Sequence, residues 1–162
     1  MTPGAEDTGS SLAFQEAAGD AFEFLVREYG YKFAGGDRQR VTWRSPRTDV
    51  AVEYDPYSAE VDVLVRPRAL TVAGVLRVLK GDGSTPFTLS DIAAWGHADE
   101  VLAELPAVAE NAPTLHQKLP QLAQWLRSLG DPLLRGNTTN FRELDRCVSR
   151  YSAEATRRAR RQ

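Results

Sequence analysis

Apolar residues along the first part of the chain change their spacing, from helical to alternating. Between residues 10 and 29 they recur every three or four positions, with charged residues on the opposite side. The apolar positions are Ala18, Phe22, Leu25, Val26 and Tyr29. Ser10 or Ser11 can cap this segment, and Gly30 can end it in a left-handed conformation. The pattern therefore predicts an amphipathic helix over residues 10–29.

From residue 31 to residue 66 apolar and polar residues alternate, which is typical of strands with one buried face. Turn-forming sequences at residues 35–37, 45–48 and 55–58 separate the alternating runs. The valines and Trp43 fall on one side of these runs, and the charged residues fall on the other. We expect an antiparallel meander with one apolar and one charged face.

The second half of the chain reads mainly as helix. Residues 69–89 fit either a helix or a strand, and Phe87-Thr88-Leu89 can add a short strand. Ser90 can cap a helix ending near Trp95, and leucines at helical spacing predict a further helix over residues 115–129. The last helix is expected from Asn140, with a capping box at Glu143. Together these patterns predict an α+β fold of three to five strands, with the first and last helices covering the valine face.

The 162 residues fit one domain, which we expect to span residues 10–162 after a disordered leader at residues 1–9. A net charge of −2 gives no general attraction to nucleic acid. The chain has one cysteine, no signal-peptide pattern and no apolar run long enough for a membrane span, so a cytoplasmic location is expected.

Charged residues on the outward side of the meander form the main candidate site. With four-residue turns, Arg40 lies opposite Glu53 and Arg44 lies opposite Asp49, as cross-strand charge pairs. The same assumption places Glu60 opposite Glu53, and Asp62 opposite Ala51. Glu60 and Asp62 are then an acidic surplus unless Arg66 or Arg68 reaches them. Such a face is usually just the solvated side of a sheet, but it can also bind a basic partner protein. A second candidate surface is the loop over residues 131–140.

Catalytic and metal-binding patterns are absent from the sequence. The two histidines, His97 and His116, have too few neighbouring ligands for zinc, and no phosphate-binding or nucleophile motif occurs. We therefore predict no enzyme activity, no metal and no cofactor. Cys147 is expected to be a small buried hydrophobic residue. An overlooked enzyme would use Asp91, Trp95 and His97 at a helix end.

The C-terminal tail, residues 155–162, is rich in arginine. Its cations are Arg157, Arg158, Arg160 and Arg161. A fraying helix end whose cations complement the helix dipole is the favoured interpretation. The alternative is an accessory protein that binds nucleic acid through these arginines. The absence of aromatic residues among them favours the first interpretation.

Several segments resemble small bacterial proteins, some of which are classed as immunity proteins of polymorphic toxin systems. The similarity is carried by residues 22–31 (FEFLVREYGY), 52–54 (VEY), 87–92 (FTLSDI) and 126–137 (LRSLGDPLLRGN). These are caps, turns and core positions, so the resemblance assigns no catalytic residue. It implies a small α+β domain that binds another protein, such as a cognate toxin, and blocks its site.

Overall fold

A five-stranded antiparallel sheet forms one layer of the protein. The computed structural model describes residues 7–68, 86–111 and 115–159. The strands lie side by side in chain order, and each pairs antiparallel with the next. They are β1 (Lys32–Gly36), β2 (Arg40–Arg44), β3 (Thr48–Asp55), β4 (Glu60–Pro67) and β5 (Phe87–Thr88). The predicted meander is confirmed, and the short fifth strand completes it.

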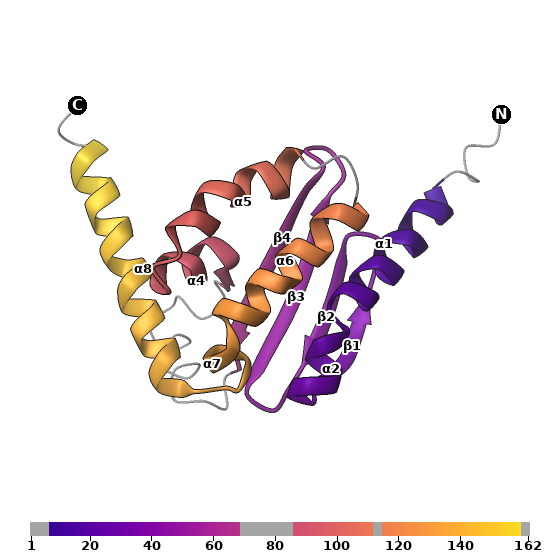
Figure 1. Ribbon diagram of the computed structural model, residues 1–162, viewed down its shortest axis with the longest axis horizontal. Coiled ribbons are helices and arrows are strands. Elements are labelled where there is room, and N and C mark those ends of the chain that lie inside the picture. Colours follow the sequence, from indigo (N-terminus) through magenta and orange to yellow (C-terminus); the bar gives the residue numbers. More distant parts are fainter. Residues whose placement is uncertain (1–6, 69–85, 112–114, 160–162) are drawn as a thin grey trace.

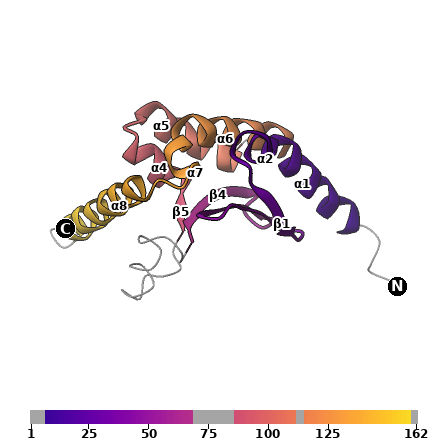
Figure 2. The same cartoon turned by 90° about the horizontal axis from the view of Figure 1, so that it is seen from below.

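Helices form a second layer on one side of this sheet (Figures 1 and 2). The helices of the described residues are α1 (Asp7–Ala21), α2 (Glu23–Tyr29), α4 (Leu89–Trp95), α5 (Asp99–Asn111), α6 (Leu115–Leu129), α7 (Asp131–Leu134) and α8 (Thr138–Ala159), of which α8 lies at the side of this layer. The α+β class is therefore confirmed. Among the described residues, no helix has the length and apolar character needed to cross a membrane.

The core lies between the valine face of the sheet and the helices. Valines of β2, β3 and β4 are almost fully buried, and the ring of Phe22 stacks on that of Trp43 with centroids 5.5 Å apart. From the helical side, Leu119, Leu122 and Leu126 of α6 fill the same core. The alternation of the strands and the leucine spacing of α6 thus meet in one apolar layer.

The N-terminal helix is interrupted once and begins earlier than expected. Helix α1 starts at Asp7, so residues 7–9 are helical, while residues 1–6 lie outside the described part. The chain turns at Phe22 before α2, and Gly30 ends α2 with φ of +69°, as predicted. Val26, expected on the buried side of this helix, is 45% exposed.

Two helix caps differ from the expected ones. The hydroxyl of Thr88 accepts the Asp91 N–H, and the Asp91 carboxylate accepts the Thr88 N–H, so Thr88 and not Ser90 caps α4. At α8, the side-chain oxygen of Asn137 accepts the N–H groups of Thr139 and Asn140. That helix therefore starts earlier than the predicted Asn140. In both cases a polar side chain earlier in the sequence than the predicted cap accepts the free N–H groups of the first helical turn.

The last helix does not take the position expected for it. Helix α6 packs against β4 next to α1, whereas α8 packs on α4 and α7 at the side of the molecule (Figure 1). Its Phe141 ring stacks on Phe87 of β5, with centroids 6.1 Å apart. Helix α8 continues to Ala159, so the first part of the predicted fraying tail is helical. The choice between helix and strand for residues 69–85 falls outside the described residues.

Candidate functional site

The face of the sheet opposite the helices carries the predicted site residues. Figure 2 shows the helices above the sheet and this face turned away from them. We call it the outer face; along β1 to β4 it consists of Lys32, Arg40, Thr42, Arg44, Asp49, Ala51, Glu53, Asp55, Glu60, Asp62, Leu64 and Arg66. The structure thus brings all five predicted partner-binding residues to one surface.

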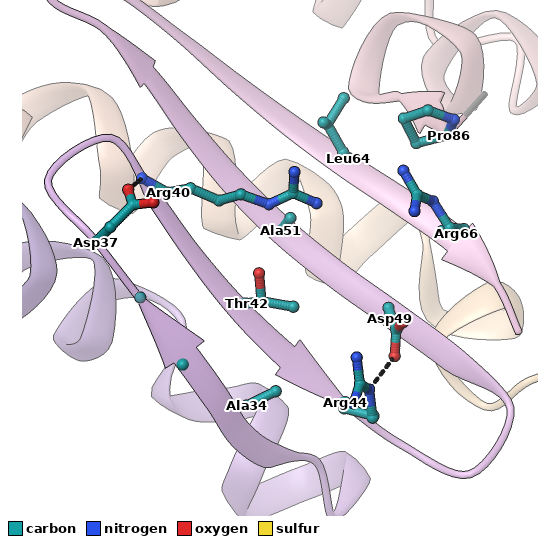
Figure 3. A pocket seen from close by; sticks show the side chains of 12 residues that line it. Ala34, Asp37, Arg40, Thr42, Arg44, Asp49, Ala51, Leu64, Arg66 and Pro86 are labelled. Carbon is teal, nitrogen blue, oxygen red and sulfur yellow. Dashed lines mark hydrogen bonds and ion pairs between the residues drawn. The ribbon is translucent and has the colours of Figure 1, made fainter. Parts of the chain in front are cut away.

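The charge pairs predicted for the first hairpin are present. Arg40 lies opposite Glu53 with an N–O distance of 2.8 Å, and Arg44 lies opposite Asp49 at 3.1 Å. All four side chains are at least partly exposed, so each pair contributes only about 0.2–1 kcal/mol. Arg44 and Asp49 are drawn with their contact in Figure 3.

The register predicted for the second hairpin is wrong. Asp62 lies opposite Glu53, and Glu60 lies opposite Asp55. Strand β3 extends through Asp55, so the turn comprises residues 56–59 instead of 55–58. Pairing extends one residue further on β3 and begins one residue later on β4, because Asp55 folds the turn itself: its carboxylate accepts the N–H of Tyr57 and the hydroxyl of Ser58, both at 2.9 Å. The shift keeps every side chain on its predicted face.

An acidic hollow lies at the end of the outer face next to this turn. It has a volume of about 460 Å³. Its acidic lining residues are Asp37, Glu53, Asp55, Glu60 and Asp62, accompanied by Arg40, Tyr54 and Tyr57. Tyr57 is 97% exposed at its rim. The outer face is thus most negative where the chain reverses between β3 and β4.

The carboxyl groups of the acidic hollow have different environments. The hydrogen bonds from the Tyr57 N–H and the Ser58 hydroxyl lower the pKa of Asp55. Partial loss of hydration within the sheet surface raises the pKa of Asp62. Within the part of the chain that the structure describes, neither Asp62 nor Glu60 has an ion-pair partner. Arg68 approaches Asp49 at 4.0 Å instead.

A second hollow, the arginine hollow, adjoins the acidic one and is shown in Figure 3. It has a volume of about 380 Å³. Thr42, Ala51 and Leu64 form its floor, and the guanidinium groups of Arg40, Arg44 and Arg66 surround them. Ala51 is only 5% exposed although it lies on the outer face. Small floor residues between long cationic side chains leave room for a group from another molecule.

A buried lysine attaches the acidic turn to the helical layer, which sequence patterns did not indicate. Lys118 of α6 is only 3% exposed, and its ammonium donates a hydrogen bond to the carbonyl of Ala59. Ala59 has φ of +56°, a left-handed conformation uncommon for a residue with a side chain. The only sign of this contact in the sequence is that Lys118 directly precedes Leu119, which belongs to the apolar stripe of α6.

The loop over residues 131–140, the second candidate surface, is largely used inside the molecule. Leu133, Leu134 and Gly136 are buried. The carbonyl of Leu133 accepts the Thr48 hydroxyl at 3.3 Å, and that of Leu134 accepts the Tyr31 hydroxyl at 3.0 Å. Burial raises the pKa of Tyr31 to about 12. These contacts favour a structural role for the loop, namely holding the β2–β3 turn.

A surface groove of about 530 Å³ runs between α8 and the turn after α4. Its lining includes Trp95, His97, Cys147, Arg146 and Arg150, together with Glu143 and Tyr151. Cys147 is therefore part-exposed and shares a groove with a histidine, contrary to the expected small core residue. His97 itself is exposed and left-handed, with φ of +54°.

The other residues singled out by sequence have structural environments. The Asp91 carboxylate is engaged in the α4 cap and does not line the groove of His97. Trp43 is a core residue, whereas Trp95 is half-buried at the groove. Across the described ranges, no three His, Cys, Asp or Glu side chains are grouped as a metal site requires. The positions of Arg160 and Arg161 lie outside those ranges.

Comparison with known proteins found no matching family model, no matching curated protein and no matching solved structure.

Proposed function

We propose that this chain is a non-enzymatic protein-binding module of the immunity or antitoxin type. Its acidic hollow would dock on a basic surface of a partner protein, such as a cognate toxin, and occlude it. The observation that carries this proposal is the group formed by Asp55, Glu60 and Asp62. These carboxylates gather at one end of an open sheet face, and no cation of the described residues pairs with Glu60 or Asp62.

Electrostatics give this surface a reason to bind. A carboxylate that has lost part of its hydration without gaining a cation is less stable, which is the state of Asp62. A lysine or arginine of a partner would remove that cost while also approaching Glu60. Complementary charges of this kind raise association rates and select partners. Tyr57, almost fully exposed at the rim, is one of the residue types enriched among interface anchors.

The same geometry favours binding over catalysis. A carboxyl that acts as a general acid needs a strongly raised pKa in an enclosed site. The Asp55 carboxylate instead accepts two hydrogen bonds from its own turn, which lower its pKa. Asp62 is accessible on the sheet surface. Blocking the site of a toxin requires only such a rigid, charged surface.

The test compares capture and affinity for matched charge variants. The wild-type chain is used as bait in a lysate of the source organism, and the captured protein is purified. The double variant Glu60→Lys and Asp62→Lys is expected to bind that protein at least about tenfold more weakly, and the affinity of the wild-type chain should fall as salt increases. The control is the double variant Glu100→Lys and Glu104→Lys, which makes the same change on exposed positions of α5. Equal affinity of the hollow variant and wild type would remove the acidic hollow as the binding site.

A second candidate function, a nucleic-acid accessory protein, is favoured by the groove along α8. Arg146 and Arg150 have no ion-pair partner among the described residues, and Trp95 and Tyr151 line the same groove. Guanidinium groups beside aromatic rings suit single-stranded nucleic acid, whose bases stack on such rings. The sequence hid this arrangement because Trp95 comes from another helix.

Fluorescence polarisation with an oligothymidylate at low and moderate salt tests this candidate. The double variant Arg146→Glu and Arg150→Glu, and a chain lacking residues 155–162, should each lose binding if it holds. Absence of oligothymidylate binding by the wild-type chain at low salt would exclude the nucleic-acid function.

A further inference from the structure

Strand register sorts the outer-face side chains into rows that cross the sheet. Starting at the β3–β4 turn, the rows are Asp55–Glu60, then Arg40–Glu53–Asp62, then Thr42–Ala51–Leu64, and last Lys32–Arg44–Asp49–Arg66. The rows are two residues apart along each strand, so neighbouring rows are separated by about 6.6 Å. The third row carries no charge.

Charges in the middle of the face neutralise each other. The ion pairs of Arg40 with Glu53 and of Arg44 with Asp49 each join neighbouring strands within one row. Two cations and two anions are therefore engaged internally. What an approaching molecule meets is the set of charges left over.

The remaining charges are segregated by sign. Asp55, Glu60 and Asp62 lie at the turn end, and Lys32 and Arg66 lie at the opposite end. Within the described ranges, Lys32 and Arg66 have no ion-pair partner, as is also the case for Glu60 and Asp62. Figure 3 shows Arg66 and Leu64 on one side of the arginine hollow, and the Arg40 guanidinium beside Ala51.

The two ends are far enough apart to be distinguished by a partner. Glu60 and Arg66 belong to the same strand and are six residues apart, so their backbone positions are about 20 Å apart. Between the ends lie Thr42, Ala51 and Leu64, which offer a small and mainly apolar contact. A surface with this charge order is complementary to another protein in only one of the two directions along the strands.

We propose that the partner presents a bipolar surface, with lysine or arginine side chains over Glu60 and Asp62 and a carboxylate beside Arg66, about 20 Å from Glu60 along the strand. This inference rests on the proposed function and deepens it, since it adds a second anchor and a fixed docking direction. In the reversed direction carboxylates would face Asp55, Glu60 and Asp62, and cations would face Arg66. Like charges brought together at an interface strongly disfavour that arrangement.

The variant Arg66→Asp separates this inference from the proposed function. If the partner offers only a basic surface, another aspartate on the outer face leaves its affinity unchanged or increases it. If the partner is bipolar, Arg66→Asp weakens binding at least about tenfold, because the partner's carboxylate then meets a like charge. The probe is the purified captured protein, and its dissociation constant is measured at low and moderate salt.

Controls keep the outcome interpretable. Arg142→Asp makes the same change at an exposed position of α8 outside the described hollows and should bind like wild type. Urea unfolding checks that Arg66→Asp is folded, and Lys32→Glu on the edge strand replaces it if it is not. Weakening by Arg66→Asp or Lys32→Glu, together with weakening by the lysine variants of Glu60 and Asp62, supports the bipolar partner.

Two results overturn the inference. If only the Glu60 and Asp62 variants weaken binding of the partner, the proposed function stands but the partner has no carboxylate at Arg66. Failure of all these variants to weaken binding removes both proposals. The last measurement is sedimentation of the wild-type chain alone. A dimer that Arg66→Asp dissociates would mean that a second copy of this chain binds the outer face, which would also overturn the inference.

Discussion

The ammonium of Lys118 on α6 donates a hydrogen bond to the carbonyl of Ala59, which joins the helical layer to the turn that carries the acidic hollow. Lys118 is buried, and Ala59 holds a left-handed conformation at the end of that turn, directly before β4. A buried polar contact of this kind fixes one position of the hairpin relative to the helices. The acidic hollow is consequently a surface of defined shape.

Replacing this lysine should loosen the turn. Lys118→Met keeps the aliphatic stem but leaves the Ala59 carbonyl without its donor, so the free energy of unfolding should fall by about 1–3 kcal/mol. Urea unfolding measures the change, and hydrogen exchange of the amides at residues 57–60 should accelerate. A more stable variant would mean that burying the ammonium costs more than its contacts contribute.

Glycine at position 136 should be essential for the contact between the α7–α8 turn and the β2–β3 turn. Gly136 has φ of +71°, and an added Cβ would lie 2.7 Å from the Cβ of Arg47. Gly136→Ala should therefore lower stability by about 1–3 kcal/mol, through backbone strain and this close approach. Gly19→Ala is the matched control: nothing lies within 4 Å of its Cβ position in α1, so a gain of about 0.5–1 kcal/mol is expected. Thermal unfolding of both variants shows whether Gly136→Ala loses stability and Gly19→Ala gains it.

Asp131 should make part of the stability depend on acid pH. Hydrogen bonds from Arg135 and from the Tyr29 hydroxyl, the latter at 2.7 Å, lower the pKa of Asp131. A lowered pKa in the folded state means that this contribution is present above the unfolded value, near 4, and is lost as pH falls through the folded value. Asp131→Asn should destabilise the protein at pH 7, and the difference from wild type should shrink on acidification. Urea unfolding across that range measures it; a constant difference would contradict the linkage.

Asp62 should make stability depend on pH in the direction opposite to Asp131. Its pKa is raised because the carboxyl loses hydration in the folded state. The stability this group contributes is therefore present below the unfolded value and is lost as pH rises through the folded one. Asp62→Asn should be more stable than wild type at pH 7 and equal to it at strongly acidic pH. Glu53→Gln, which loses the ion pair with Arg40, provides the contrast and should not be stabilised at pH 7.

Removing the aromatic ring at the break between α1 and α2 should affect the whole core. Phe22 is fully buried and stacks on Trp43. Phe22→Ala should lower the free energy of unfolding by about 3–5 kcal/mol, because a large cavity opens between the helix and the sheet. Denaturation followed by tryptophan fluorescence measures this loss. A change below about 1 kcal/mol would mean that the core closes around the missing ring.

Local patterns in the sequence determined the strands and most helices. Alternation fixed which side of β2, β3 and β4 is buried, and a register shift of two residues in the second hairpin left every side chain on that side. The same alternation placed Arg40, Arg44, Glu53, Glu60 and Asp62 on one face. Helical spacing likewise predicted the buried leucines of α6. These features depend on neighbours close in the chain, which a sequence displays directly.

Only the tertiary structure decided which distant groups meet. It brought Lys118 to Ala59, His97 to the groove of Cys147, and the α7–α8 turn to Arg47. It also decided that α6, and not α8, covers the sheet, and that Glu60 faces Asp55. The physical reason is that burial and hydrogen-bond satisfaction are properties of the whole packed chain, whereas periodicity reports only which side of one element is apolar.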